Sequence, residues 1–310
     1  MKIFCLRANE NWICDRFVDE WIEYHHGSIT NNPHEADILW LVASWCWNQL
    51  PIDLLRSKTV ITTVHHLDLT KFDENQKNSF AFRDSLTDYY HVPCQATKDQ
   101  IRPFTSKEIF IQPFWVNQNI WKDKKPADDL KEKYNLPKDA LLVGSFQRDT
   151  EGHDLKSPKL SKGPDIFCDL VEGFHQNNSN VQCVLSGWRR QYVMNRLDKA
   201  GIKYHYFEWA DFETLNDLYN CLDLYLVSSR CEGGPQAIVE AAVTKTPIIS
   251  TDVGLARYIL AEESVFGDGS QTAQPNTQHA FDSVQQYLIP EGFKPFDAFF
   301  KKIHESQRNI

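Results

Sequence analysis

One stretch, residues 222–254, limits what this chain can fold into more than any other. Residues 222–227 form an apolar run with the length of a buried strand, and the turn-rich loop 228–234 follows it. Pro235 then suits the first position of a helix, and an apolar run at residues 247–250 begins a second strand. Because strands that alternate with helices build parallel sheets, this stretch predicts an α/β fold.

The loop between this strand and this helix has the composition of an anion-binding turn. Gly233 and Gly234 leave room for backbone N–H groups and the positive end of the helix dipole to face a phosphate. Glu232 and Glu240 flank the glycines, one in the loop and one inside the helix. At about 1.5 Å of rise per residue, the two carboxylates lie on the order of 10 Å apart, the span of a nucleotide diphosphate. We therefore expect hydroxyl groups to meet carboxylates at both ends of a bound diphosphate.

The chain is large enough and apolar enough for two globular cores. It has 310 residues, of which 42% are hydrophobic and 13% aromatic. Its formal net charge of -9 argues against sequence-independent nucleic-acid binding, which needs a basic face. No run approaches the roughly 18 apolar residues of a membrane span, and residues 1–8 are too mixed for a signal peptide. We expect a cytoplasmic protein without a transmembrane segment, and peripheral contact with a membrane stays open.

The 8 cysteines show no C-x-x-C spacing and mostly fall inside apolar segments. This pattern predicts reduced core residues rather than a zinc site or a disulfide framework. We expect Cys231, in the loop before Glu232, to be a packing residue rather than a nucleophile, because no histidine is fixed beside it.

The first 115 residues alternate between apolar runs and polar or amphipathic segments. An amphipathic helix around Phe17 and Trp21 follows the first run, and we expect Asn11 to cap it. This alternation predicts a parallel sheet. We expect its strands at residues 2–6, 36–43, 59–64, 89–93 and 108–113.

Two adjacent histidines, His65 and His66, follow the third of these strands. In open α/β sheets, ligands bind outside the carboxyl ends of the strands, so this is a position for functional side chains. We expect one of the two to have a functional role, and their side chains to point to different sides.

The composition turns polar over residues 115–126, where a proline also interrupts the chain. We place the domain boundary here. The first domain then covers residues 1–117 and the second residues 118–310, and we expect the last helix to pack back on the first domain.

The second domain begins with a clear strand at residues 140–146, and further strands are expected at 181–186 and 204–207. A long polar connection joins the first strand to a helix at residues 165–176. In a compact α/β domain, a connection of this length is more often functional than not. It carries four cations: Arg148, Lys156, Lys159 and Lys162.

These residues together resemble the retaining glycosyltransferases of family four, which have the GT-B fold of two Rossmann-like domains with parallel sheets facing across a cleft. The main match is Glu232-Gly-Gly-Pro-Gln-Ala-Ile-Val-Glu240, like the Glu, seven residues, Glu motif of the family. The resemblance is specific over residues 140–262 and loose over the first 115. The other matches are Lys162-Gly163, Thr63-Val64-His65, residues 111–117 and residues 247–254.

The resemblance implies a donor site in the second domain. Arg148 and Lys162 would clamp the donor diphosphate and stabilise the leaving group, which a metal does elsewhere. Glu232 would bind hydroxyl groups of the donor sugar, and Glu240 the ribose of the nucleotide. Further donor contacts would come from Ser145, Gly163, Gly233, Gly234, Pro235, Gln236 and Trp209.

The resemblance also implies the reaction. A nucleotide-diphosphate sugar, UDP or GDP being the expected nucleotide, would give its sugar to a glycan, lipid-linked or small hydroxyl acceptor. Transfer would proceed with retention, without a metal, a cofactor or a protein nucleophile, and His65 would line the first-domain side near the reacting carbon. The glycine-rich loop after the first strand of the family is replaced by residues 7–12, which contain no glycine, so contacts there are not carried over.

Other classes of protein compete with this interpretation. A non-catalytic sugar-nucleotide-binding protein of the same fold is the main alternative, because the first-strand glycines are missing. An epimerase or phosphorylase of the same architecture stays open. A GT-A transferase is disfavoured because no two aspartates are spaced as D-x-D, and a dinucleotide-dependent oxidoreductase because G-x-G-x-x-G is absent.

Overall fold

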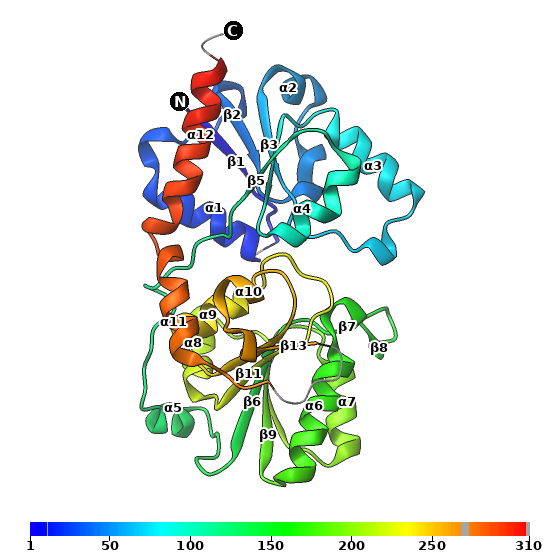
Figure 1. Ribbon diagram of the computed structural model, residues 1–310, viewed down its shortest axis with the longest axis vertical. Coiled ribbons are helices and arrows are strands. Elements are labelled where there is room, and N and C mark those ends of the chain that lie inside the picture. The colour runs from blue at the N-terminus through cyan, green and yellow to red at the C-terminus, as the bar shows by residue number, and fades with distance from the viewer. Residues whose placement is uncertain (11, 268–272, 308–310) are drawn as a thin grey trace. The chain divides into compact units, whose positions relative to one another are not determined.

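The computed structural model describes residues 1–10, 12–267 and 273–307 of the chain (Figure 1). Contacts between residues divide it into two compact units. Unit 1 comprises Met1–Trp115 and the C-terminal segment that begins at Ile289, and unit 2 comprises Val116–Leu288. Each unit is built around its own sheet.

Unit 1 contains a five-stranded parallel sheet with the order β1-β2-β3-β4-β5. Every strand lies within a segment where the sequence predicts one, because apolar runs bounded by polar turns specify buried strands. The strands are β1 (Ile3–Leu6), β2 (Ile38–Leu41), β3 (Thr59–Thr63), β4 (Tyr89–Val92) and β5 (Glu108–Ile111).

Helices cover this sheet, and the first of them is amphipathic as predicted. Helix α1 (Ile13–Tyr24) buries Phe17 and Trp21 on one face. Trp12 occupies its N-cap position without a side-chain hydrogen bond, while Asn11, our predicted cap, lies outside the described residues. The other helices of unit 1 are α2 (Ile52–Ser57), α3 (Glu74–Asp84), α4 (Gln95–Ile101) and α12 (Lys294–Gln307).

An aromatic core joins α1 and α12 to the sheet of unit 1. The ring of Trp21 packs edge-on against Trp40 of β2, with centroids 5.4 Å apart. Phe300 of α12 packs against Trp21 at 5.4 Å and against Trp40 at 5.1 Å. Because these rings belong to one buried cluster, the C-terminal helix is part of the core of unit 1.

A buried hydrogen-bond chain crosses the same core. Trp40 Nε1 donates to Thr63 Oγ1 at 2.9 Å, and that hydroxyl lies 3.0 Å from His91 Nδ1. His91 Nε2 lies 2.8 Å from the carbonyl oxygen of Gln112. Because a carbonyl only accepts, Nε2 carries the proton and Nδ1 accepts from Thr63. Burial lowers the pKa of His91 to about 3, so this imidazole is neutral at ordinary pH.

Unit 2 contains a six-stranded parallel sheet with the order β10-β9-β6-β11-β12-β13. The chain begins the sheet in its interior at β6, adds β9 and β10 on one side, and then adds β11 to β13 on the other. The strands of the sheet are β6 (Leu141–Phe146), β9 (Val181–Ser186), β10 (Tyr204–Phe207), β11 (Leu224–Val227), β12 (Ile248–Thr251) and β13 (Val265–Phe266). Ligands bind outside the carboxyl ends of strands where the order reverses, which here is between β6 and β11.

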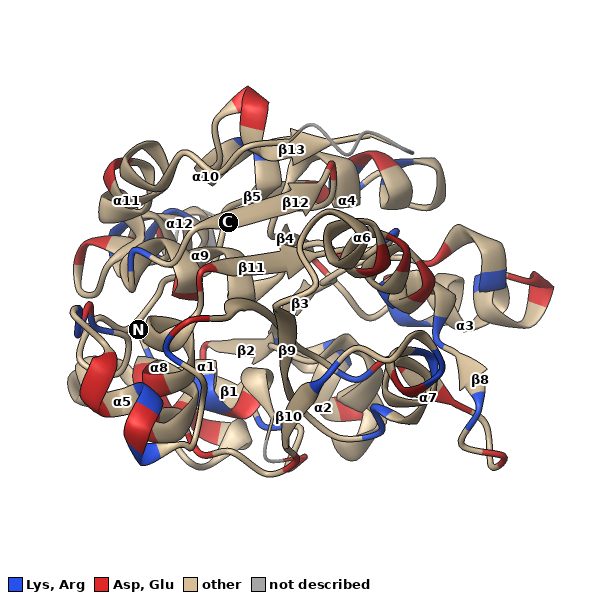
Figure 2. Cartoon of the chain, turned by 90° about the horizontal axis from the view of Figure 1, so that it is seen from below, with Lys and Arg blue, Asp and Glu red and all other residues tan. Residues whose placement is uncertain are grey.

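The polar connection after β6 is partly ordered as a small hairpin. Its strands β7 (Thr150–Glu151) and β8 (Ser157–Pro158) pair in antiparallel register. The helices of unit 2 are α5 (Asp128–Lys133), α6 (Pro164–Asn177), α7 (Gln191–Ala200), α8 (Phe212–Cys221), α9 (Gln236–Val243), α10 (Ala256–Ile259) and α11 (Thr277–Val284). Acidic and basic residues mix along exposed helices such as α5 (Figure 2), which is a solvated arrangement rather than a basic face.

Candidate active site

An ion pair between Lys162 and Glu232 lies at the carboxyl edge of the unit 2 sheet. Lys162 ends the short 3-10 helix Leu160–Lys162 after the hairpin, and Glu232 lies in the loop after β11. The hydroxyl of Ser229 also donates to Glu232 Oε1 at 3.4 Å. The two side chains are 21% and 12% exposed, so the carboxylate and the ammonium are largely shielded from bulk water.

The backbone around Lys162 is fixed by contacts that require glycine next to it. Gly163 has φ of 59°, and a Cβ there would overlap the carbonyl oxygen of Ser228. The carbonyl oxygen of Lys162 accepts from Gln147 Nε2 at 3.0 Å and from Ser228 Oγ at 3.3 Å. The Lys162-Gly163 pair is therefore clamped between the ends of β6 and β11.

The Glu232 loop is supported from the side of β12. Gly254 has φ of 52°, and a Cβ there would overlap the carbonyl oxygen of Gly233. Thr251 Oγ1 donates to the carbonyl oxygen of Ser229 at 2.6 Å. Pro235 is the N-cap of α9, which begins at Gln236, so the two glycines lead into a helix N-terminus as the sequence predicts.

Glu240 lies inside α9 and is buried. The hydroxyl of Tyr219 donates to Glu240 Oε2 at 3.1 Å. Burial raises the pKa of Tyr219 well above its usual value, so this phenol stays protonated and acts as a donor to the carboxylate. One oxygen of Glu240 is thereby oriented by the protein itself.

Arg148 lies beside the aromatic side chain of Trp188. Its Nε donates to the carbonyl oxygen of Thr150 at 3.3 Å, and its guanidinium carbon lies 5.0 Å from the Trp188 ring centroid. The neighbouring Lys159 has its pKa lowered, first by burial and then by Lys162 and Arg148. Lys162 and Arg148 are thus close enough to Lys159 to repel its ammonium. A bound anion would relieve this repulsion.

A fully buried ion pair lies near the carboxyl edge of the unit 2 sheet, and the sequence did not predict it. Arg190 pairs with Asp149, and both side chains are 0% exposed. Arg190 also donates to the carbonyl oxygen of Ser186 at 2.7 Å and to Ser145 Oγ at 3.2 Å. Ser145, a predicted donor contact, is therefore buried against Arg190. The one signal in the sequence is the Trp-Arg-Arg run that follows β9 after Gly187.

Trp209, another predicted donor contact, follows β10 and is 74% exposed. Its ring is stacked with that of Trp188, with centroids 6.3 Å apart and planes at 26°. The two indoles therefore form an exposed aromatic pair at the carboxyl ends of β9 and β10.

His65 belongs to unit 1, unlike the other predicted site residues. Its Nε2 lies 2.8 Å from the carbonyl oxygen of Val42 and 3.4 Å from Cys14 Sγ. Because a carbonyl only accepts, Nε2 is protonated and donates. His65 is half-buried, whereas the neighbouring His66 is exposed, so the two histidines have different environments.

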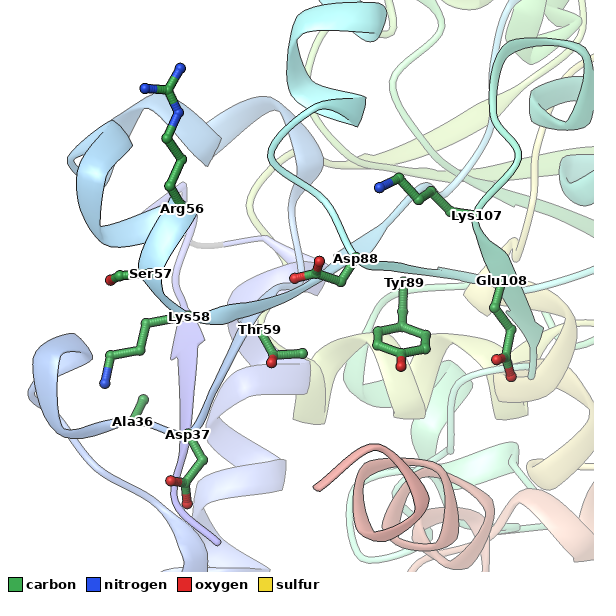
Figure 3. Close-up of a pocket in the computed structure, with 10 residues that line it drawn as sticks. All are labelled: Ala36, Asp37, Arg56, Ser57, Lys58, Thr59, Asp88, Tyr89, Lys107 and Glu108. Atoms are coloured by element: carbon green, nitrogen blue, oxygen red, sulfur yellow. The ribbon is translucent and has the colours of Figure 1, made fainter. Parts of the chain in front are cut away.

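A cavity of about 690 Å³ in unit 1 lies away from these residues (Figure 3). It is lined by residues at the amino ends of the strands, such as Thr59, Tyr89 and Glu108. Both acidic and basic residues line the cavity, among them Asp88 and Lys107 (Figure 3). It is therefore at the edge of the sheet opposite to His65.

All 8 cysteines lie within the described residues and outside any disulfide; Cys231 is half-buried and the other seven are buried. In the part of the chain that the structure describes, no three His, Cys, Asp or Glu side chains gather where they could hold a metal ion. Within the same residues, every helix is too short or too polar to cross a membrane.

Comparisons with known proteins agree with this arrangement. Residues 157–293 match the family model of glycosyl transferases group 1. Sucrose-phosphate synthase from Thermosynechococcus elongatus has a similar structure, with a TM-score of 0.69, 15% identity and coverage of 94% of this chain and 78% of that one. HepE of Anabaena, solved with UDP and glucose, gives a TM-score of 0.72 at 12% identity over 100% of both chains.

A third structure, the pneumococcal O-GlcNAc transferase GtfA with UDP and GlcNAc, has a TM-score of 0.62 at 14% identity and covers 86% of this chain and 56% of that one. Among curated proteins, the comparison finds no match. The chain therefore has the α/β fold of GT-B glycosyltransferases, and its residues 157–293 are similar to the family of glycosyl transferases group 1.

Proposed function

We propose that this chain transfers a sugar from a nucleotide-diphosphate sugar to a hydroxyl acceptor, with retention and without a metal. The observation that carries the proposal is the Lys162 and Glu232 ion pair beside the turn of Gly233 and Gly234. It places a cation, a carboxylate and backbone N–H groups at one sheet edge. Those are the groups that a sugar diphosphate needs.

Lys162 is proposed to bind the diphosphate and to stabilise the charge that develops on it as the sugar leaves. Without substrate, its ammonium is paired with Glu232. A diphosphate carries more negative charge than one carboxylate and would draw the ammonium away, which releases Glu232 to accept from hydroxyl groups of the sugar. Arg148 is proposed to assist, since Lys162 and Arg148 both lower the pKa of Lys159 and therefore lie near it.

Glu240 is proposed to accept from the ribose of the nucleotide. The hydroxyl of Tyr219 donates to its Oε2 at 3.1 Å and so orients the carboxylate, whose oxygens accept hydrogen bonds from hydroxyl groups. The order Glu232, seven residues, Glu240 supports placing the chain in family four of the retaining transferases. Trp209 is proposed to lie beside the base, and the structures of HepE with UDP and with UDP-glucose favour UDP over GDP.

The same charges support the proposal that the reaction needs no metal, and the proposal of retention rests on the resemblance to family four. Lys162 and Arg148 would supply the positive charge that balances the leaving diphosphate, so no residue is proposed to hold a metal. No carboxylate is proposed as a nucleophile, because Glu232 is assigned to the sugar hydroxyls. His65 of unit 1 is proposed to lie near the reacting carbon.

The proposal is tested by turnover of UDP-glucose and related sugar nucleotides, measured as slow hydrolysis or as transfer. Lys162→Ala should lower kcat by about 100-fold to 1000-fold, as removal of one transition-state donor does. Lys199→Ala, which removes an exposed lysine of α7, is the matched control and should not change the rate. Activity that EDTA abolishes, or an inverted product anomer, would contradict the metal-independent or the retaining part.

A second candidate is a sugar-nucleotide-binding protein without turnover. The observation that favours it is that backbone N–H groups of Asn9 and Glu10, after β1, are already bonded to the carboxylate of Asp15. This candidate predicts that UDP binds while no sugar nucleotide is consumed. Any turnover that Glu232→Gln abolishes would reject it.

A further inference from the structure

Unit 1 presents a second group of polar and aromatic side chains, at the carboxyl edge of its sheet. The segments after β1, β2 and β3 bring Glu10, Trp45 and His65 together. Trp45 Nε1 donates to Glu10 Oε1 at 3.0 Å. The ring centroids of Trp45 and His65 are 6.0 Å apart. Three segments that are distant in the sequence therefore build one surface.

Trp45 is exposed and yet held in place. Its side chain is 48% exposed, which is unusual for an indole that is also hydrogen-bonded and packed against another ring. An indole fixed in this way offers one flat apolar face with polar groups at its rim. This is the combination that binds a sugar, because the C–H face of a pyranose packs on the ring while its hydroxyl groups reach the rim.

The rim is made by Glu10 and His65, whose positions are fixed. The His65 ring stacks on Phe114 with centroids 5.6 Å apart and planes at 12°, and its Nε2 donates to the carbonyl oxygen of Val42. The carboxylate of Glu10 accepts hydrogen bonds and donates none. Sugar hydroxyl groups, which donate, are the natural partners of such a carboxylate.

The loop after β1 excludes an anion from this surface. Asn9 has φ of 58°, which turns successive N–H groups toward one point, as in an anion-binding nest. That point is occupied by Asp15, whose Oδ1 and Oδ2 accept from the amides of Asn9 and Glu10 at 2.9 and 2.7 Å. The nest is filled by a carboxylate of the chain itself, which is only 8% exposed. A phosphate at this surface would therefore meet the carboxylates of Asp15 and Glu10 instead of free backbone amides.

The nearest cations on these segments are engaged elsewhere. Arg7 pairs with Asp19, and Arg16 lies 3.9 Å from Glu20. Neither offers compensation for a phosphate beside Asp15. The local charge of the surface is therefore negative.

We infer that unit 1 binds a neutral sugar on Trp45, with its hydroxyl groups on Glu10 and His65, and discriminates against a phosphorylated or carboxylated sugar. The inference rests on the proposed function only in calling that sugar the acceptor. The binding surface is a property of unit 1 by itself.

The test is saturation-transfer NMR on the full chain without any donor. The probes are neutral disaccharides of glucose, galactose and N-acetylglucosamine, and the 6-phosphates of the three monosaccharides. A neutral disaccharide should bind at least about tenfold more tightly than any of the phosphates. Trp45→Ala should abolish the signal of the disaccharide. Tyr24→Ala, which removes an exposed aromatic side chain at the C-terminal end of α1, should leave that signal unchanged.

Two further variants separate charge from packing. Glu10→Gln keeps an acceptor for Trp45 Nε1 and removes the charge, so it should keep neutral binding and reduce the discrimination against phosphates. Trp45→Phe should restore part of the signal that Trp45→Ala loses, which a merely unfolded loop would not allow. No signal for any neutral sugar, or a phosphate that binds as tightly, overturns the inference.

The donor assay is read separately. If UDP binds and Lys162→Ala weakens UDP binding, while sugar phosphates bind more tightly than neutral sugars in the NMR experiment, only the inference about unit 1 fails. If neutral sugars bind through Trp45 and no sugar nucleotide does, the surface stands and the proposed transferase fails.

Discussion

The first sheet strand of each unit leads through a connection to a helix, β1 to α1 and β6 to α6, and the two connections differ in their charged groups. In unit 1 the amides after β1 are bonded to the carboxylate of Asp15, and residues 7–12 contain no glycine. In unit 2 the connection after β6 ends in Gly163, in a left-handed conformation, and carries Arg148 and Lys162. In unit 1 the backbone amides after β1 donate to a carboxylate of the same unit, whereas in unit 2 the connection after β6 carries basic side chains.

The two sheets have the same parallel architecture, and the loops at their edges determine which ligand each unit can bind. Both sheets are parallel, and both place loops at their carboxyl edges. Among the described residues, the connection after β6 carries Arg148 and Lys162, whereas Arg7, directly after β1, is paired with Asp19. We therefore assign the anionic substrate to unit 2 and the neutral one to unit 1.

The largest expected effect is on the stability of unit 2. Arg190→Met leaves Asp149 buried without its partner, which typically costs about 3–5 kcal/mol. Urea unfolding should show this loss, while Lys199→Met, on the exposed side of α7, should leave the midpoint unchanged. The pair Arg190→Met with Asp149→Leu should recover much of the loss, since it removes both charges. Equal stability of the single variant would contradict the structural role of the pair.

The next effect is on the closed connection of unit 1. Asp15→Asn keeps one acceptor oxygen and loses the other, so one of the amides of Asn9 and Glu10 loses its partner, at a cost of about 1–3 kcal/mol. The affinity for UDP should not change, because the donor is assigned to unit 2. Asp15→Ala should cost more than Asp15→Asn in the same unfolding experiment. A change of tenfold or more in UDP affinity would contradict the assignment of the donor to unit 2 alone.

The sequence predicted more of the sheets than of the interactions at their edges. Apolar runs located every strand of the unit 1 sheet, and the motif from Glu232 to Glu240 located the turn before α9. The pairing of Arg190 with Asp149 and of Trp45 with Glu10 could not be predicted in this way. Each joins segments that are far apart in the chain, and local periodicity carries no information on which distant side chain fills a buried position.

The smallest effect is on acid stability and concerns His91. Its pKa of about 3 in the folded protein is far below the usual value near 6.5, because burial disfavours the charged ring. The unfolded chain therefore binds a proton more readily as the pH falls below about 6.5. The stability that His91 contributes is complete above that pH and is lost as the pH falls toward 3, by about 2 kcal/mol at pH 5.

Thermal unfolding of the protein and of His91→Gln between pH 7 and pH 5 measures this contribution. The variant should be less stable at pH 7 and should lose less stability on acidification than the parent. An identical pH dependence in the two proteins would show that His91 does not set the acid sensitivity of unit 1.

The most direct measurement is a calorimetric titration of UDP into the parent chain and three variants. We expect one site in the parent, binding at least about tenfold weaker in Lys162→Ala, and parent affinity in both Lys199→Ala and Asp15→Asn. UDP that binds Lys162→Ala with the affinity of the parent, or that loses affinity in Asp15→Asn, would contradict the assignment of the donor to unit 2.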